Sequence, residues 1–189
     1  MTNVTFSLSM SLDGFVAGPN DEIDPLHDWL FSGEHESAAG FGRMSEESRD
    51  VMDPAIDLLG AVVVGRNTFE ASGRWDGKPL FGAPTFVVTH SPPTENRGEF
   101  TYVTEGVEAA VEQARAAAGD KDVAVMGAIV PQQAIRAGLV DEFMIHLIPV
   151  LLGEGKRLFD HLGGRVDLER TQVVEAPEGV THLRFRVVR

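Results

Sequence analysis

Three short segments of this 189-residue sequence place glycine or small hydroxyl residues directly after an apolar, β-forming stretch. They are Val64-Gly65-Arg66-Asn67-Thr68, Val88-Thr89-His90-Ser91 and Met126-Gly127-Ala128-Ile129-Val130. Glycine lets the backbone approach a phosphate closely, and the start of a following helix offers unpaired N–H donors. Arg66 adds a forked cation that suits a phosphate, and His90 is a second candidate cation. Hydroxyl groups come from Thr68, Thr89 and Ser91. Together the segments predict a dinucleotide site.

A simpler interpretation of the same segments is that their glycines only make tight turns between strands and helices. The pattern GxGxxG, which marks a standard Rossmann site, is absent from the sequence. The residues alone therefore leave the dinucleotide site as one of two interpretations.

Asp13 follows the first apolar stretch and precedes Gly14. A carboxylate at the end of a strand could anchor a substrate hydroxyl or amine, or help to deliver a proton during hydride transfer. An Asp-Gly pair is also a common turn, in which the aspartate caps nearby backbone groups. Both roles remain open for Asp13.

These residues need a scaffold in which several strands end at one edge of a sheet. Strands are predicted at 4–12, 61–64, 85–89, 100–103, 122–126, 142–152, 165–175 and 180–188, and helices at 25–31, 45–60, 67–72, 107–118 and 130–137. Pro54 should kink or break the helix at 45–60. The alternation of strands and helices predicts one α/β domain over residues 1–189, with a mixed, mostly parallel sheet of about eight strands and a C-terminal antiparallel hairpin.

The composition excludes several classes of function. The formal net charge of −13 repels nucleic acid, so we expect a small-molecule substrate and a nucleotide site that is only locally positive. The absence of cysteine excludes disulfides, thiolate metal sites and a cysteine nucleophile. The histidines show no metal-ligand spacing, and no metal is expected. His146, within an apolar stretch, is interpreted as a hydrogen-bonded core or interface histidine.

The sequence also carries no sign of a membrane or export signal. The N-terminus lacks a basic start followed by a long apolar core, and no apolar run approaches the roughly 18 residues that a spanning helix needs. We therefore expect a cytoplasmic protein without a membrane partner.

Four blocks of the sequence resemble, in the same order, the signature blocks of the dihydrofolate-reductase-like superfamily. They are SMSLDGFVAGPND at 9–21, VVVGRNTFEASGRW at 62–75, FVVTH at 86–90 and the long, most specific block at 123–159. The most similar branch is the reductase domain of the riboflavin-pathway deaminase–reductase. The resemblance implies NADPH-dependent hydride transfer to a small heterocyclic or ribosyl-amino-pyrimidine-like substrate. The deaminase half needs a zinc site with two cysteines, so this chain resembles a stand-alone reductase domain.

The resemblance also implies which residues bind the nucleotide end of NADPH. The family's GRxT block, here Gly65, Arg66 and Thr68, contacts the cofactor phosphates and the adenosine side. The pair Thr89 and His90, followed by Ser91, corresponds to the region of the 2′-phosphate and favours NADPH over NADH.

The family's Gly-Gly pair, often joined by a cis peptide bond, faces the pyrophosphate and corresponds here to Gly127-Ala128, ahead of Ile129 and Val130. The alanine departs from the family pattern, and a non-proline cis bond costs about 3 kcal/mol. Ala17 would lie against the nicotinamide.

On the substrate side, the loop Leu152–Lys156 resembles the family's LLGxG loop, which places Gly153 and Glu154 beside the substrate. Phe15 and Trp29 could form walls of the substrate pocket, or be ordinary core aromatics. The acid that protonates pterin in true dihydrofolate reductases has no convincing counterpart, although Asp24 and Asp28 are nearby.

Several functional hypotheses follow from this pattern. The preferred one is an NADPH-dependent reductase that forms a homodimer. The alternatives are dihydrofolate reductase activity, a non-catalytic dimer of the same fold that binds a nucleotide or metabolite, and an interaction module that dimerises through the 142–152 strand and the terminal hairpin without binding NADPH.

Overall fold

The computed structural model describes residues 2–95 and 98–189, and the chain divides into two compact units. Unit 1 comprises Met1–Phe6 and Leu58–Asp141, and unit 2 comprises Ser7–Asp57 and Glu142–Arg189. Each unit contains a part of the chain's main sheet, and the candidate residues are distributed over both.

Unit 1 is built from short strands of β-branched residues that alternate with helices. Its strands are the first part of β1 (Val4–Ser11), β5 (Leu59–Gly65), β6 (Thr85–Val88), β7 (Phe100–Val103) and β8 (Asp122–Met126). Its helices are α2 (Arg66–Ala71), η2 (Gly73–Gly77), η3 (Leu80–Gly82), α3 (Val107–Ala118) and α4 (Ile129–Arg136). The helix α3 packs on β5, β6 and β8 through small apolar side chains, among them Ala110 and Ala114, which are fully buried.

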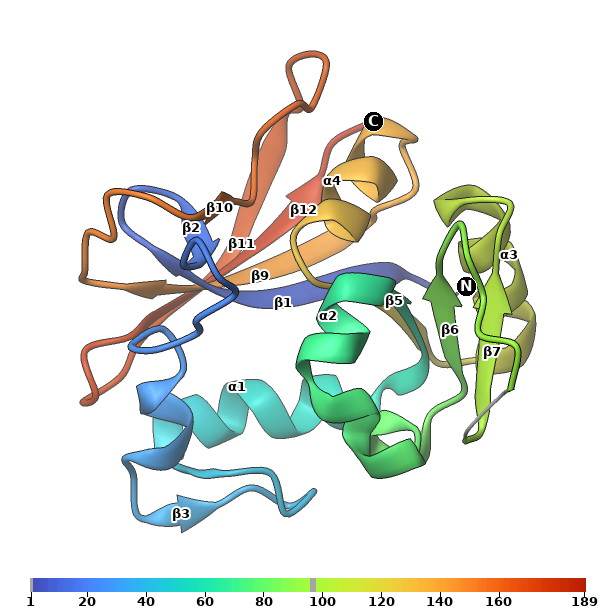
Figure 1. Cartoon of the computed structure of the whole chain (residues 1–189). Coiled ribbons are helices and arrows are strands. Elements are labelled where there is room, and N and C mark those ends of the chain that lie inside the picture. The colour runs from blue at the N-terminus through green and yellow to red at the C-terminus, as the bar shows by residue number, and fades with distance from the viewer. Residues whose placement is uncertain (1, 96–97) are drawn as a thin grey trace. The chain divides into compact units, whose positions relative to one another are not determined.

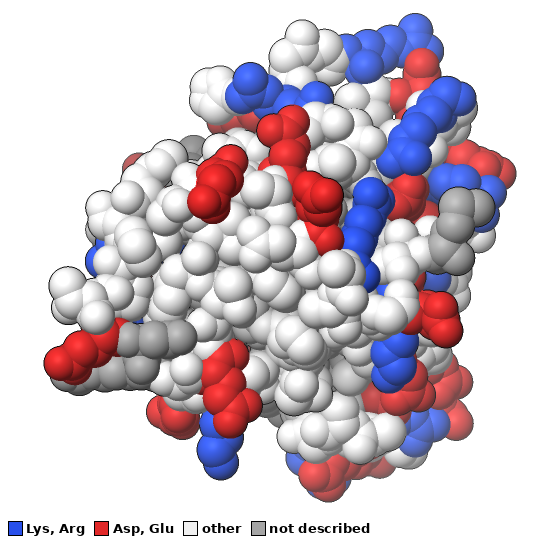
Figure 2. Space-filling model, turned by 90° about the vertical axis from the view of Figure 1, so that its right-hand side faces the viewer, with Lys and Arg blue, Asp and Glu red and all other residues white. Residues whose placement is uncertain are grey.

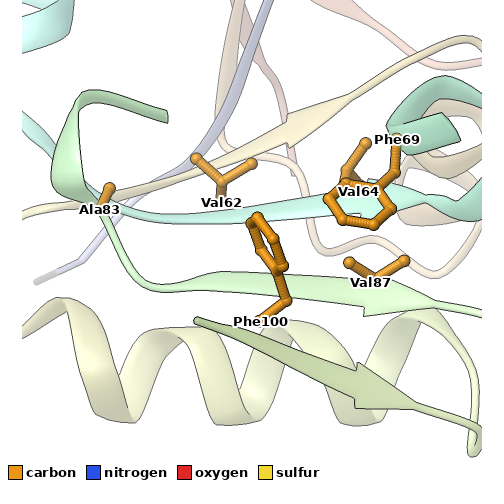
Figure 3. Close-up of a cluster of buried hydrophobic side chains, with 6 residues drawn as sticks. All are labelled: Val62, Val64, Phe69, Ala83, Val87 and Phe100. Atoms are coloured by element: carbon orange, nitrogen blue, oxygen red, sulfur yellow. The ribbon is translucent and has the colours of Figure 1, made fainter. Parts of the chain in front are cut away.

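A cluster of buried side chains fixes α2 against the strands of unit 1 (Figure 3). Val62 and Val64 of β5, Val87 of β6 and Phe100 of β7 belong to one buried cluster with Phe69 of α2. The rings of Phe69 and Phe100 meet edge to face at a centroid distance of 4.7 Å. Because Phe69 is almost fully buried, this contact sets the position of the first turn of α2, which carries the GRxT residues.

Unit 2 combines the second part of β1 with longer antiparallel strands and several short elements. Its further strands are β2 (Phe15–Ala17), β3 (His35–Glu36), β4 (Arg43–Met44), β9 (Glu142–Ile148), β10 (Lys156–Arg157), β11 (Leu168–Glu175) and β12 (Thr181–Val187). Its helices are η1 (Asp28–Phe31) and α1 (Glu46–Asp57). The buried residues of its core include Trp29, Leu30 and Met44.

The main sheet has eight strands in the order β11-β12-β9-β1-β8-β5-β6-β7 (Figure 1). The strands of unit 1 pair in parallel, and β12 pairs antiparallel with both β9 and β11. The predicted α/β class, the mixed sheet and the C-terminal hairpin are therefore confirmed. Smaller antiparallel pairs, β2–β10 and β3–β4, were not predicted, because strands of two or three residues are too short to show a periodicity.

Three predictions about individual elements were wrong. The helix α1 runs through Pro54 without a break. Proline has no N–H to donate to the carbonyl of Asp50. Because Asp50 is exposed, water can satisfy that carbonyl. The helix predicted at 25–31 is only the 3₁₀ turn Asp28–Phe31. The strand predicted at 142–152 ends at Ile148, because Pro149 cannot donate to a neighbouring strand.

Among the described residues, no helix has both the length and the apolar character needed to cross a membrane.

Candidate functional site

In unit 1 the carboxyl ends of three parallel strands finish at the same level. The residue Gly65 is the register partner of Val88, and Val64 is the partner of Met126. The turns that follow β5, β6 and β8 therefore start side by side. This is the edge at which parallel α/β sheets bind their ligands.

Gly127 brings the third turn into direct contact with the first. Its φ of +87° lies in the region that favours glycine, and a Cβ on this residue would overlap Oγ1 of Thr68 and lie 3.2 Å from the Cβ of that residue. A Cβ on Gly65 would lie 3.3 Å from Cγ2 of Val130. The two glycines therefore let the turns after β5 and β8 pack directly against each other, with Thr68 on Gly127 and Val130 on Gly65.

Arg66 joins the first turn to the second. Its Nη1 donates a hydrogen bond to the carbonyl oxygen of Ser91 at 2.8 Å, and its Nε lies 3.9 Å from a carboxylate oxygen of Glu70. The side chain remains about half exposed, and a guanidinium has further N–H groups to donate. Arg66 is thus a cation at the edge of the sheet that is held in place by the backbone of a neighbouring turn.

The turn after β6 is closed by its own hydroxyl groups. Thr89 is buried, its Oγ1 accepts a hydrogen bond from the N–H of Ser91 at 3.2 Å, and its N–H donates to the carbonyl of Val103 at 3.0 Å. His90 and Ser91 are exposed. Thr89 therefore shapes the turn, and His90 and Ser91 are the residues of this segment that a ligand can reach.

The helix α4 starts directly after Gly127-Ala128 and has no side-chain cap at its N-terminus. The only cis peptide bond in the described part of the chain joins Asp24 to Pro25, so the bond between Gly127 and Ala128 is trans. Ile129, at the first turn of α4, is exposed, and Val130 is buried. The turn after β8 therefore leads directly into the uncapped N-terminus of α4.

In unit 2 a row of three serines organises the residues of the expected substrate side. Ser7, Ser9 and Ser11 alternate along β1 with Phe6, Leu8 and Met10, so the three hydroxyl groups share one face of the strand. Each hydroxyl has a side-chain partner, respectively His146, Trp29 and Asp13. The row was not identified as a site in the sequence, although its alternation is visible there.

Asp13 holds the LLGxG loop. Its carboxylate accepts hydrogen bonds from the hydroxyl of Ser11 at 2.6 Å and from the N–H groups of Leu152 and Gly153 at 3.2 and 2.8 Å. The hydrogen bond from Ser11, followed by those from the backbone, lowers the pKa of Asp13 below its usual value. The arrangement favours the turn-capping interpretation, because an ionised carboxylate with these partners has no proton to give.

The other substrate-side candidates gather around β2 and β10. The guanidinium of Arg157 lies over the ring of buried Phe15 at 4.3 Å and donates a hydrogen bond to the carbonyl of Asp13. Ala17 is buried; a Cβ on Gly155, whose φ is +137°, would collide with its carbonyl oxygen. The loop residues Gly153 and Glu154 are exposed.

Trp29 lies in the core of unit 2, beside two histidines. Its Nε1 donates a hydrogen bond to Oγ of Ser9 at 3.0 Å, and its ring packs on His146 and His182 at 4.7 and 5.0 Å. His146 and His182 are cross-strand partners of β9 and β12, and their Nδ1 atoms are 2.6 Å apart. His146 is thus the hydrogen-bonded core histidine that was predicted, whereas its pairing with His182 was not.

Charged side chains of both signs are mixed on the surface. The face drawn in Figure 2 has acidic side chains around a largely uncharged middle, and its basic side chains lie among further acidic ones. Within residues 2–95 and 98–189, no three His, Asp or Glu side chains come together in a group that could hold a metal ion.

Comparison with known proteins gives both a family and a fold. A model of the RibD C-terminal domain matches residues 2–182. The structure is similar to a putative riboflavin biosynthesis protein from Shewanella sp. PV-4, with a TM-score of 0.77, 21% identity and full coverage of both chains. It is similar to dihydrofolate reductase from Enterococcus faecalis complexed with NADP(H), with a TM-score of 0.64 and 17% identity over 99% of this chain and 97% of the other.

A third similar structure is a diaminohydroxyphosphoribosylaminopyrimidine deaminase/5-amino-6-(5-phosphoribosylamino)uracil reductase from Thermotoga maritima. The TM-score is 0.67 with 14% identity, over 99% of this chain and 57% of that protein. The dihydrofolate-reductase-like fold, with its riboflavin-pathway reductase-like form, is therefore confirmed.

Proposed function

Since the chain belongs to the RibD C-terminal domain family, we propose that it is an NADPH-dependent reductase of a small heterocyclic or ribosyl-amino-pyrimidine-like substrate. The observation that supports the proposal is the contact of Gly127 with Thr68, which brings the strand ends of β5 and β8 together beside the uncapped start of α4. The N–H groups at such a helix start are the donors that a phosphate group needs.

Unit 1 has the groups that a doubly phosphorylated nucleotide needs. The backbone of Gly65, Gly127 and Ala128, with the uncapped start of α4, suits the pyrophosphate. Arg66 is a cation held beside Ser91, and we assign both residues, with Thr68, Thr89 and His90, to the phosphate and adenosine side. Bound NADPH would supply hydride, and the protein would orient it and balance its charge.

Unit 2 supplies the substrate side in this proposal. Asp13 holds the backbone of Gly153 in place, so that exposed Glu154 and the loop are presented in a fixed conformation. Phe15, covered by Arg157, gives this region an apolar wall with a cation on it. Buried Trp29 is held by Ser9 and supports β1 from the core. Asp13 is therefore assigned to positioning.

The proposal is tested by titrating NADPH and NADH into the protein and following the fluorescence of the bound nicotinamide. Arg66→Ala should weaken NADPH binding about tenfold, or about 1.4 kcal/mol, and should weaken NADH binding less, because NADH lacks the 2′-phosphate that the guanidinium is proposed to contact. Arg136→Ala removes another exposed arginine of unit 1 and serves as the matched control. Equal affinity in Arg66→Ala and the native protein would refute the phosphate assignment.

Turnover separates a reductase from a binding protein of the same fold. Oxidation of NADPH, followed by the loss of the absorbance of its reduced nicotinamide, should accompany reduction of a ribosylaminopyrimidine more readily than reduction of dihydrofolate. Binding of NADPH without oxidation by either substrate would support the non-catalytic alternative.

We also propose that the protein forms a homodimer. The strand β11 is at one end of the sheet order and has Leu168 and Val173 exposed, which suits pairing with a second copy. Light scattering behind a sizing column gives the mass, and a monomeric mass at micromolar concentration would contradict the proposal.

A further inference from the structure

Four side chains of unit 2 form a continuous hydrogen-bonded chain from the surface into the core. Oγ of exposed Ser7 lies 2.7 Å from Nε2 of His146, and the two Nδ1 atoms of His146 and His182 are 2.6 Å apart. Nε2 of His182 then lies 3.0 Å from Oγ of Ser48, which is fully buried. The roles assigned above use none of these groups.

The contact between the two Nδ1 atoms requires exactly one proton, because a hydrogen bond needs one donor and one acceptor. If His146 donates at Nδ1, its Nε2 accepts from the hydroxyl of Ser7. If His182 donates instead, Nε2–H of His146 donates to Ser7, and the Ser7 hydroxyl is free to donate outward. The neutral pair thus has two arrangements that differ in the direction of the Ser7 hydroxyl.

One extra proton can enter the pair without breaking any of these hydrogen bonds. His146 then carries protons on both nitrogens and donates to Ser7 and to Nδ1 of His182, while Nε2–H of His182 donates to Ser48. The cation is therefore fully hydrogen-bonded. The pair can store a proton close to the surface at the cost of burying one charge.

We propose that the His146–His182 pair is the proton source of the reductase and that the hydroxyl of Ser7 delivers the proton to the substrate. This inference rests on the proposed function, which supplies hydride but has left the second hydrogen without a donor. Ser7 belongs to the same serine row as Ser9 and Ser11, which hold Trp29 and Asp13, so its hydroxyl is on the face of β1 that carries the substrate-side residues.

Each turnover moves one proton from the pair through Ser7 to the substrate. When the substrate carbon has received hydride, the heteroatom of the reduced double bond takes the proton of the Ser7 hydroxyl, and that O–H bond breaks. The proton on Nε2 of His146 moves to Oγ of Ser7, and the pair returns to its neutral form. A hydronium ion at the exposed Ser7 reloads the pair and is left as water, so each turnover takes one proton from solvent.

The surroundings keep the pair neutral near pH 7 and make an added proton strongly acidic, so the charged pair is a short-lived state of the relay and not its resting state. Burial lowers the pKa of His146 well below its ordinary value, with a further contribution from His182 and His27, and burial lowers the pKa of His182 to about 4. Glu178 acts in the opposite direction on His182, and one of its carboxylate oxygens is buried and has no hydrogen-bond partner in the described part of the chain. His27 and Glu178 are thus the titratable groups whose charge acts on the pair.

Ser7→Ala tests the delivery step, because it removes one exposed hydroxyl and leaves the histidines in place. We expect turnover of a ribosylaminopyrimidine to fall about 100-fold, as is typical when general acid catalysis is lost, with NADPH affinity unchanged. Ser7→Thr keeps the hydroxyl and should restore most of the rate. Ser32→Ala, at another exposed serine of unit 2, is the control.

Two outcomes of this assay have different meanings. Equal turnover in Ser7→Ala and the native protein overturns the relay and leaves the reductase intact. Absence of NADPH oxidation by the native protein refutes the proposed function, and the catalytic use of the pair is refuted with it.

NMR of protein labelled with ¹⁵N-histidine tests the relay without turnover. Near pH 7 the native spectrum should show one proton shared between the two Nδ1 atoms, and acid should add one proton to the pair as a unit. In Ser7→Ala the ring N–H protons should exchange with water at least tenfold more slowly, while Ser32→Ala leaves the exchange unchanged. Two unprotonated Nδ1 atoms, or exchange that is unaffected by Ser7→Ala, would overturn the proposal.

Discussion

Unit 1 builds its candidate site from backbone, and unit 2 builds its candidate site from side chains. In unit 1 the closest contact between the turns involves a glycine, and Arg66 is fixed by a carbonyl oxygen. In unit 2 the serines of β1 are each held by a polar side chain. A site made of backbone groups works only where no side chain blocks them, whereas a side-chain network works only where every partner is present. Substitutions in the two units should therefore have effects of different kinds.

The largest effect on stability is expected from breaking the histidine pair. His146→Leu leaves Nδ1 of buried His182 without its partner and removes a ring that packs on Trp29. An unsatisfied buried polar group costs about 1–3 kcal/mol, so we expect the free energy of unfolding to fall by about 2–3 kcal/mol. Urea denaturation measures the loss. NADPH affinity should not change, because the nucleotide residues are in unit 1; an equal loss of affinity would erase the contrast between the units.

The same pair should make the native protein sensitive to acid. Folding lowers the pKa of both histidines below the ordinary 6.5, so the unfolded chain binds more protons between pH 6.5 and about 4. The free energy of unfolding should therefore fall as pH decreases through this range. The double variant His146→Leu/His182→Leu should lose less stability between pH 6.5 and 5 than the native protein does. Parallel pH profiles would show that the pair is not the cause.

An intermediate effect, on binding instead of stability, is expected from Gly127→Ala. The new Cβ would overlap Oγ1 of Thr68 and must adopt a φ of +87°, so the turn has to move. We expect NADPH affinity to fall about tenfold, or about 1.4 kcal/mol. Gly106→Ala is the control, because Gly106 has a similar φ of +98° but no atom within 4 Å of the added Cβ.

Gly106→Ala should reduce stability through backbone strain alone and leave the binding of NADPH intact. If both glycine variants lose affinity to the same degree, strain and not the close approach to Thr68 explains the loss.

The contrast between the units also explains what could be predicted from the sequence. Strands β7 and β8, helix α3 and the three junctions of unit 1 were predicted, because short runs of β-forming residues indicate strands and an Ala-rich stretch ended by Gly119 indicates a helix. The pairing of His146 with His182 depends on the register of β9 and β12, and Ser48 is 134 residues from His182. No local pattern encodes such a contact, so the network of unit 2 became visible only in the folded structure.

The smallest effect is expected from Trp29→Phe, which probes one hydrogen bond of the serine row. Phenylalanine keeps an aromatic ring beside His146 but cannot donate to Oγ of Ser9, so Trp29→Phe should lower the free energy of unfolding by about 1 kcal/mol beyond the loss of packing. Combining Trp29→Phe with Ser9→Ala separates the contribution of the hydrogen bond from the contribution of packing. If the hydrogen bond stabilises the core, the double variant will be destabilised by less than the sum of the single ones. Additive losses would mean that packing alone holds Trp29, and the side-chain network of unit 2 would then begin at Ser7 and not extend along β1.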